Sequence, residues 1–135
     1  MKKREGQNTW EDYEVFTSKG AKIKDPKVTI TENSTFLFNA AFVHKADIAK
    51  YTRVILGYSP QNKIITFQFT KDTQAKGALT LINRPGSAAV VSNAFFNFYF
   101  LNIQDLAGRY VPKILKIPKV GEVWAIDLSS KVPEK

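Results

Sequence analysis

The residue types that most often perform acid–base, nucleophilic or metal chemistry are scarce in this chain of 135 residues. It has one histidine, His44, and no cysteine, so triads, thiolate metal sites and disulfides lack their components. His44 lies beside Lys45 and Asp47 with no second metal-type ligand near in sequence, which indicates a solvated helix residue. No G-x-S-x-G, P-loop or G-x-G-x-x-G motif occurs. The sequence therefore predicts no enzyme, no cofactor, no metal and no small-molecule substrate.

Basic residues are the chemically informative group. The chain carries 20 Lys and Arg against 12 Asp and Glu, a formal net charge of +8. Residues 1–26 carry six basic and five acidic side chains, whereas residues 27–71 carry six against two and residues 76–128 six against three. Such a field favours a polyanion, either nucleic acid or an anionic membrane. Lysines that only keep a strand-rich protein soluble are the alternative interpretation.

Two basic clusters are candidate anion-binding sites. One precedes the first predicted strand, and the other surrounds the last predicted hairpin, where Lys113, Lys116 and Lys119 recur every third residue and so do not share one face of a strand. Arginine is the preferred contact because its guanidinium can grip a phosphate or a guanine edge with two hydrogen bonds. We predict nucleic-acid contacts at Arg53, Arg109, Lys113, Lys116, Lys22 and Lys24.

The elements that would position these side chains begin near residue 27. KVTIT (27–31) alternates apolar and polar residues as a half-buried strand does, ENS (32–34) supplies turn residues, and TFLF (35–38) is a second strand. Asn39 is a good N-cap for a helix that we expect to run to about residue 51. A hairpin follows, with its turn at residues 59–62.

The second half repeats this order. ALTLI (78–82) is a predicted strand, residues 83–87 form a turn, and AAVV (88–91) is the next strand. Asn93 is expected to cap the aromatic helix AFFNFYFL, and a final hairpin turns at residues 118–121.

The two predicted hairpins align without a gap, Val54 to Phe69 on Lys113 to Leu128, with shared apolar positions. Unrelated hairpins would also share a two-residue period. We predict a strand-rich α+β domain over residues 27–128. It would consist of two β-β-α-β-β repeats, 27–71 and 76–128, interleaved into one pseudo-twofold, barrel-like domain. Residues 1–26 would form a partly ordered arm and residues 129–135 a tail.

The predicted aromatic helix has two apolar faces. Phe95, Phe98 and Tyr99 lie on the face expected to join the core. Phe96 and Phe100 lie on the other, where they predict a homodimer interface. The alternative is that the N-terminal arm covers them through its aromatic residues, Trp10 and Phe16.

The succession KVTIT, ENS, TFLFNAAF and a hairpin resembles the AbrB-type swapped-hairpin fold, with Ser34 and Asn39 where that family usually has a glycine and a proline. The resemblance implies DNA binding, usually by dimers that offer basic side chains from loops and helix. Over about residues 26–128 the chain also resembles a family of small bacterial proteins without an established activity. That second resemblance rests on VILGYSPQNKIITFQF, VVSNAFFNFYFLNI and WAIDL.

Two functions remain open at this point. The first is a small basic DNA-binding or transcription-associated protein of AbrB-like architecture. The alternative is a protein–protein adaptor or structural module that uses an exposed aromatic helix. The basic N-terminus lacks an apolar signal region, and no run of apolar residues is long enough to span a bilayer. The sequence therefore predicts a cytoplasmic protein with no membrane partner.

Overall fold

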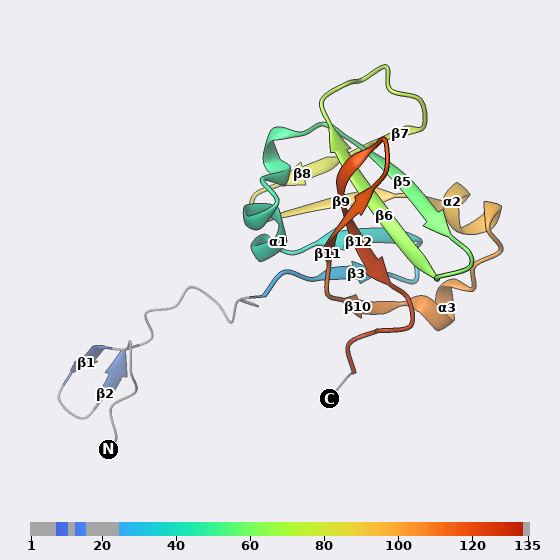
Figure 1. Ribbon diagram of the computed structural model, residues 1–135. Coiled ribbons are helices and arrows are strands. Elements are labelled where there is room, and N and C mark those ends of the chain that lie inside the picture. Colours follow the sequence, from blue (N-terminus) through green and yellow to red (C-terminus); the bar gives the residue numbers. More distant parts are fainter. Residues whose placement is uncertain (1–7, 11–12, 16–24, 134–135) are drawn as a thin grey trace.

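The computed structural model describes residues 8–10, 13–15 and 25–133 (Figure 1). Strands β1 (Asn8–Trp10) and β2 (Tyr13–Val15) pair with each other in an antiparallel two-stranded sheet. Most of the expected N-terminal arm, including the predicted contacts Lys22 and Lys24, lies outside the described residues.

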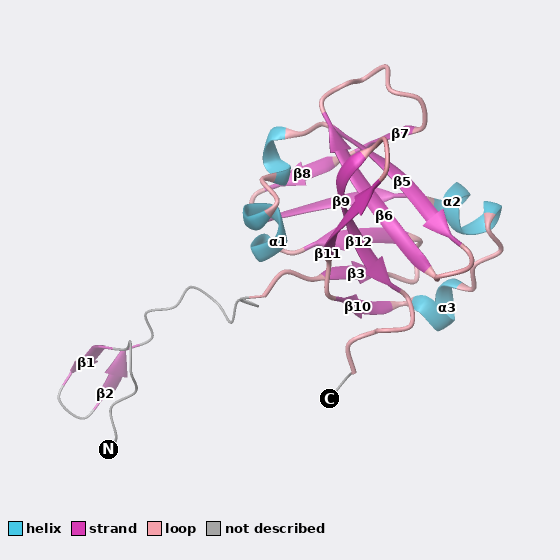
Figure 2. Cartoon of the chain, in the orientation of Figure 1, coloured by secondary structure: helices cyan, strands magenta, loops and turns pink. Residues whose placement is uncertain are grey.

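The rest of the described chain forms two five-stranded sheets in which every pairing is antiparallel (Figure 2). The strands of the first sheet, in spatial order, are β10 (Gly108–Tyr110), β3 (Val28–Ile30), β4 (Thr35–Phe38), β9 (Ser87–Val91) and β8 (Ile82–Arg84). The strands of the second are β11 (Lys113–Ile117), β12 (Gly121–Asp127), β6 (Ile64–Thr70), β5 (Arg53–Ser59) and β7 (Ala78–Thr80).

The protein is thus strand-rich α+β, as the sequence predicts. Within the described residues each five-stranded sheet is open, because it ends in two edge strands and does not close on itself. The edges are β10 and β8 in the first sheet and β11 and β7 in the second.

The core lies between the two sheets and is built largely from aromatic rings. Phe36 and Phe38 of β4 meet Phe67 of β6 edge to face, with ring centroids 5.1 and 5.4 Å from it. All three side chains are fully buried. Both β4 rings point inward, while Thr35 is half-buried and Leu37 is exposed, because successive side chains of a strand face opposite sides.

Short helices lie at the ends of the sandwich. They are α1 (Ala40–Lys45), the 3₁₀ turn η1 (Ile48–Lys50), α2 (Asn93–Phe98) and α3 (Ile103–Leu106). The Asn39 side chain accepts a hydrogen bond from the Phe42 backbone at 3.0 Å, so the predicted N-cap is confirmed. The first helix is shorter than expected because Asp47 adopts a left-handed backbone, φ 55°, that ends it. The predicted cap at Asn93 is wrong by one residue, since Ser92 is the N-cap of α2.

The predicted strand ALTLI is two strands in two different sheets. Residues 78–80 pair with β5 in the second sheet, and residues 82–84 pair with β9 in the first. Between them lies Leu81, which is buried and whose backbone N–H donates to the Thr52 carbonyl. The chain therefore crosses from one sheet to the other at Leu81, a change of partner that apolar alternation does not encode.

Candidate functional site: exposed aromatic rings and dispersed cations

The aromatic segment after β9 places some rings inside and others in solvent. Phe96 is only 2% exposed and stacks on Phe36, with ring centroids 5.2 Å apart. Phe98 is 73% exposed and Phe100 is 94% exposed. The prediction that Phe96 and Phe100 share one uncovered face is therefore wrong, and so is the placement of Phe98 toward the core. The helix is too short for Phe96 and Phe100 to be neighbours on one face, because it ends at Phe98.

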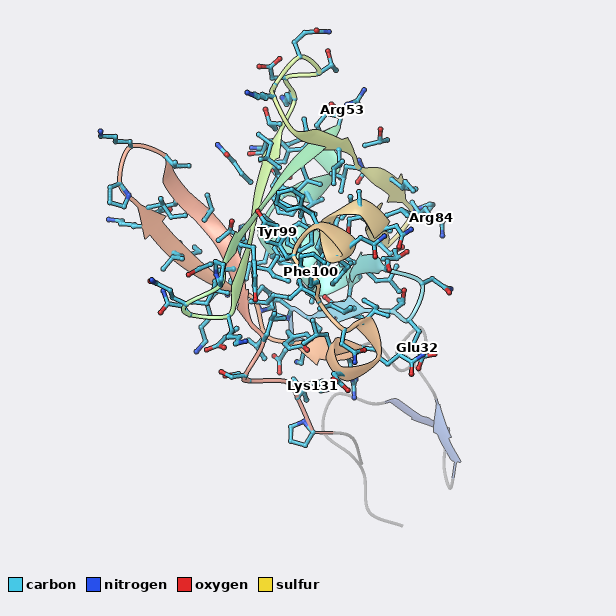
Figure 3. The ribbon with its side chains drawn as sticks, turned by 90° about the vertical axis from the view of Figure 1, so that its right-hand side faces the viewer. Glu32, Arg53, Arg84, Tyr99, Phe100 and Lys131 are labelled. Carbon is cyan, nitrogen blue, oxygen red and sulfur yellow. The ribbon has the colours of Figure 1, made fainter. Side chains whose placement is uncertain are left out.

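The backbone that ends α2 forms a capping motif at Tyr99 and Phe100, the two residues of this segment that Figure 3 labels. The Leu101 N–H donates to the Phe96 carbonyl at 2.9 Å, and the Phe100 N–H donates to the Asn97 carbonyl at 3.2 Å. These two bonds define a Schellman motif, whose first residue beyond the cap is left-handed and is usually glycine. Here that residue is Phe100, with φ 53°. A phenylalanine in this conformation costs about 1 kcal/mol relative to glycine.

A chain of ring contacts connects the exposed Phe98 to the core. The Phe98 ring meets the Tyr99 ring at 4.9 Å edge to face, and Tyr99 in turn lies 5.2 Å from Phe95. Phe95 contacts Phe96 at 5.5 Å. Aromatic pairs at these separations attract each other beyond simple burial. The exposed Phe98 ring is therefore connected, through Tyr99 and Phe95, to the buried Phe96 ring.

A hollow of about 340 Å³ lies beside Phe100. It lies among β5, the turn between β5 and β6, the segment from the end of α2 through α3, and the chain after β12. Its lining includes Tyr58, Lys63, Leu101, Asp105, Leu106 and Leu128. Most of these are apolar, while Lys63 and Asp105 supply one charge of each sign. An aromatic ring beside a shallow, largely apolar hollow can hold a flat apolar group against it.

The predicted nucleic-acid contacts are spread over the molecule. Arg53 lies on β5, and its Nη1 atom donates to the Thr52 carbonyl at 3.0 Å. Arg109 is exposed on β10, the edge of the other sheet. Lys113 and Lys116 are both exposed on β11, three positions apart in a regular ladder, and so lie on opposite faces of that strand. Among these residues the structure does not form one basic face.

Few of the cations are neutralised within the described part of the chain. The one ion pair there joins Lys50 Nζ to Asp47 Oδ2 at 3.2 Å, and it raises the pKa of Lys50 mainly through that hydrogen bond. Lys131 Nζ instead donates to the Asp105 and Ala107 carbonyls, at 2.8 and 3.1 Å, around the end of α3.

Other candidate chemistry is limited. His44 is exposed on α1, and within the described ranges no three residues of the His, Cys, Asp and Glu types are grouped as metal ligands.

Asp127 Oδ1 accepts hydrogen bonds from the Ser129 hydroxyl and backbone N–H, at 2.6 and 2.9 Å, and these lower the pKa of that carboxyl. The Asp127 carboxylate therefore stabilises the turn at the end of β12. In the described part of the chain, no helix has the length and apolar character needed to cross a bilayer.

Sequence reasoning missed Phe98 as an exposed residue, and no local signal identifies it. Asn102 is the N-cap of α3, where its side chain accepts a hydrogen bond from the Gln104 N–H at 3.1 Å. The predicted helix over residues 94–101 is compatible with this cap, whereas the observed helix ends three residues earlier, at Phe98.

Comparisons of the chain with protein-family models, with curated proteins and with solved structures find no match.

Proposed function

We propose that this chain is a small DNA-binding protein that prefers unpaired bases. Phe98 and Phe100 would stack on the bases, while the dispersed Lys and Arg side chains neutralise nearby phosphates. The observation that carries the proposal is the exposure of these two rings on a chain of net charge +8. Exposed aromatic rings in a positive field are the usual means of holding single strands, because every base has a face that can stack.

The architecture supports the same proposal through the resemblance to AbrB-type folds. We infer that residues 27–71 and 76–128 are two related β-β-α-β-β units. The sheet orders support this, because β3 and β4 meet β9 and β8 across the centre of one sheet, as β11 and β12 meet β6 and β5 across the other. Each unit thus contributes a hairpin to both sheets, and β7 and β10 are added at the edges.

The two main helices support the relation further. Both α1 and α2 have six residues, followed by one cap residue and then a left-handed residue, Asp47 or Phe100. In both, the left-handed residue donates its N–H to the carbonyl three positions earlier. Asn39 then corresponds to Ser92, not to Asn93.

The test is binding of a labelled single-stranded oligonucleotide, followed by fluorescence anisotropy, to the wild type and to Phe98→Ala/Phe100→Ala. Loss of base stacking should weaken binding at least about tenfold, because each stacked base contributes about 1–3 kcal/mol. Val91→Ala is the matched control, since Val91 is also exposed, at the end of β9. Absence of binding by the wild type at low salt would remove the proposal.

The salt dependence of binding tests the phosphate contacts separately. Each phosphate neutralised on a single strand contributes about −0.7 to the slope of log K against log salt. Arg53→Ala/Arg109→Ala should make this slope shallower by roughly 1.4 if both guanidinium groups contact phosphates. An unchanged slope would assign the contacts to other cations.

The same rings favour a second candidate function, that of a protein–protein adaptor or homodimer. Exposed phenylalanines beside an apolar hollow are typical anchors of protein interfaces. Light scattering on the wild type distinguishes this candidate from the first. A dimer that becomes a folded monomer in Phe98→Ser/Phe100→Ser would favour it, whereas a wild-type monomer would exclude the homodimer.

A further inference from the structure

Of the four edge strands of the large sheets, β11 is the most open. It has five residues, whereas β7, β8 and β10 have three each. The β10 edge is also partly occupied, because the Val132 N–H donates to the Arg109 carbonyl at 2.8 Å. A long edge strand offers a row of backbone groups that can pair with another strand.

The side chains of β11 are apolar and basic, and none is buried. Ile114 is 54% exposed and Leu115 is 38% exposed. Beside the strand lies a hollow of about 420 Å³ whose lining includes Ile64, Val111 and Leu115. The same hairpin carries three lysines, Lys113, Lys116 and Lys119, against two carboxylates, and one of these, that of Glu122, lies opposite Lys116 in the ladder. Asp127, at the end of β12, lowers this excess only near Lys113. The edge therefore fits a strand that is apolar and acidic.

The chain itself contains such a segment. Residues 5–16 include Glu5, Glu11, Asp12 and Glu14, with no basic residue, and three aromatic side chains. Within it, β1 and β2 pair only with each other in the described structure, over three residue pairs. An isolated two-stranded hairpin is marginally stable in water, and a third strand is normally needed to hold it.

The tether between this hairpin and the domain is long enough. Ten backbone steps separate Val15 from Asp25 and can span up to about 35 Å. Asp25 is fixed, since its carbonyl accepts a hydrogen bond from the Asn39 side chain at 2.9 Å. Val28 then pairs with Tyr110, and β11 begins three residues after Tyr110. The arm thus leaves the domain close to the start of β11.

We propose that the β1–β2 hairpin of the same chain adds to the free edge of β11 and extends the second sheet. An antiparallel register with Glu14 opposite Lys116 places Val15 opposite Leu115 and Tyr13 opposite Ile117. The two apolar pairs then lie on one face of the extended sheet, and the Glu14–Lys116 pair lies on the other face. This docking does not depend on nucleic-acid binding. It would cover Lys116 and so remove that side chain from contact with a polyanion.

Disulfide trapping tests the contact directly, because the natural chain has no cysteine. Under mild oxidation Glu14→Cys/Lys116→Cys should form an intramolecular disulfide, since directly opposed strand positions meet the distance requirement. Glu14→Cys/Arg84→Cys is the matched control, as Arg84 lies on β8, an edge of the other sheet. Equal cross-linking in the two variants, or disulfides that form only between chains and vanish on dilution, would overturn the proposal.

Hydrogen exchange of the full-length chain provides a second readout that needs no cysteine. Glu14→Lys should speed exchange of the β11 amides by about tenfold, which corresponds to 1.4 kcal/mol of lost docking. Glu14→Lys/Lys116→Glu should restore part of the slow exchange, because the pair with residue 14 is re-formed with opposite polarity while the new carboxylate lies opposite Glu122. Exchange at β11 that is equally fast in the wild type and in Glu14→Lys would also overturn the proposal. Neither readout involves nucleic acid, so failure of the docking and failure of DNA binding are distinguishable.

Discussion

The residues that follow the caps of α1 and α2 share a left-handed backbone but have opposite surroundings. Asp47 and Phe100 are both left-handed, at φ 55° and 53°. Asp47 pairs with Lys50 and leads into η1, whose Ile48 is fully buried. The Phe100 ring is almost fully exposed to solvent. Aspartate tolerates the left-handed region better than phenylalanine does. The end of α1 therefore leads to a residue of the core, Ile48. The end of α2 instead carries a strained, exposed aromatic residue, as interaction sites often do.

The largest expected effect tests whether α2 is anchored through Phe96. Phe96→Ala should lower the free energy of unfolding by about 3–5 kcal/mol, because it leaves a cavity against the buried Phe36 ring. Phe98→Ala, two residues later, should change it by less than about 0.5 kcal/mol. Urea denaturation measures both. Similar losses for the two variants would mean that the Phe98 ring is also covered in solution.

The two helix starts should differ by a smaller amount. Asn39 accepts hydrogen bonds from the Phe42 and Lys27 backbones and donates to Asp25, so Asn39→Ala should cost about 1–2 kcal/mol. Ser92 makes no side-chain cap bond to α2, and Ser92→Ala should cost less than about 0.5 kcal/mol. Thermal or urea unfolding can compare them. Equal costs would show that capping does not distinguish the helices.

The left-handed position itself gives a prediction of opposite sign. Phe100→Gly should raise the free energy of unfolding by up to about 1 kcal/mol, since glycine adopts positive φ without strain. The same variant should bind single-stranded DNA more weakly. Asp47→Gly is the comparison, with a smaller gain expected because aspartate is less strained there. A destabilised Phe100→Gly protein would show that the ring packs against the hollow beside it.

The smallest effect concerns the end of α3, where the side chains of Tyr110 and Lys131 donate hydrogen bonds to backbone carbonyls. The buried Tyr110 hydroxyl donates to the Leu106 carbonyl at 2.6 Å, and burial raises the pKa of that hydroxyl. The unfolded chain then loses this proton at a lower pH than the folded chain does. The free energy of unfolding should fall as the pH rises above about 10. In Tyr110→Phe this alkaline loss should diminish, as urea titrations at several pH values would show.

Sequence alone determined the features that depend on neighbouring residues. The alternation in TFLF predicts the residues of β4 and the face that they bury. Asn39, as an N-cap, predicts the start of α1. The turns predicted at residues 59–62 and 118–121 overlap the observed turns at residues 60–63 and 118–120, although Ser59 and Gly121 themselves pair in the ladders. Each of these follows from a two-residue period, a cap or a turn, all of which act within a few residues.

Tertiary structure decided which sheet each strand joins and which rings of an all-apolar segment are buried. The pattern of ALTLI predicts one strand. In the structure it is divided at Leu81, because the residues before Leu81 pair with β5 in one sheet and those after it pair with β9 in the other. In the aromatic segment every face is apolar, so hydrophobicity cannot choose between Phe96 and Phe98. The choice comes from Phe36, distant in sequence, and from a helix that ends early. Such outcomes depend on contacts between remote segments, which local patterns do not specify.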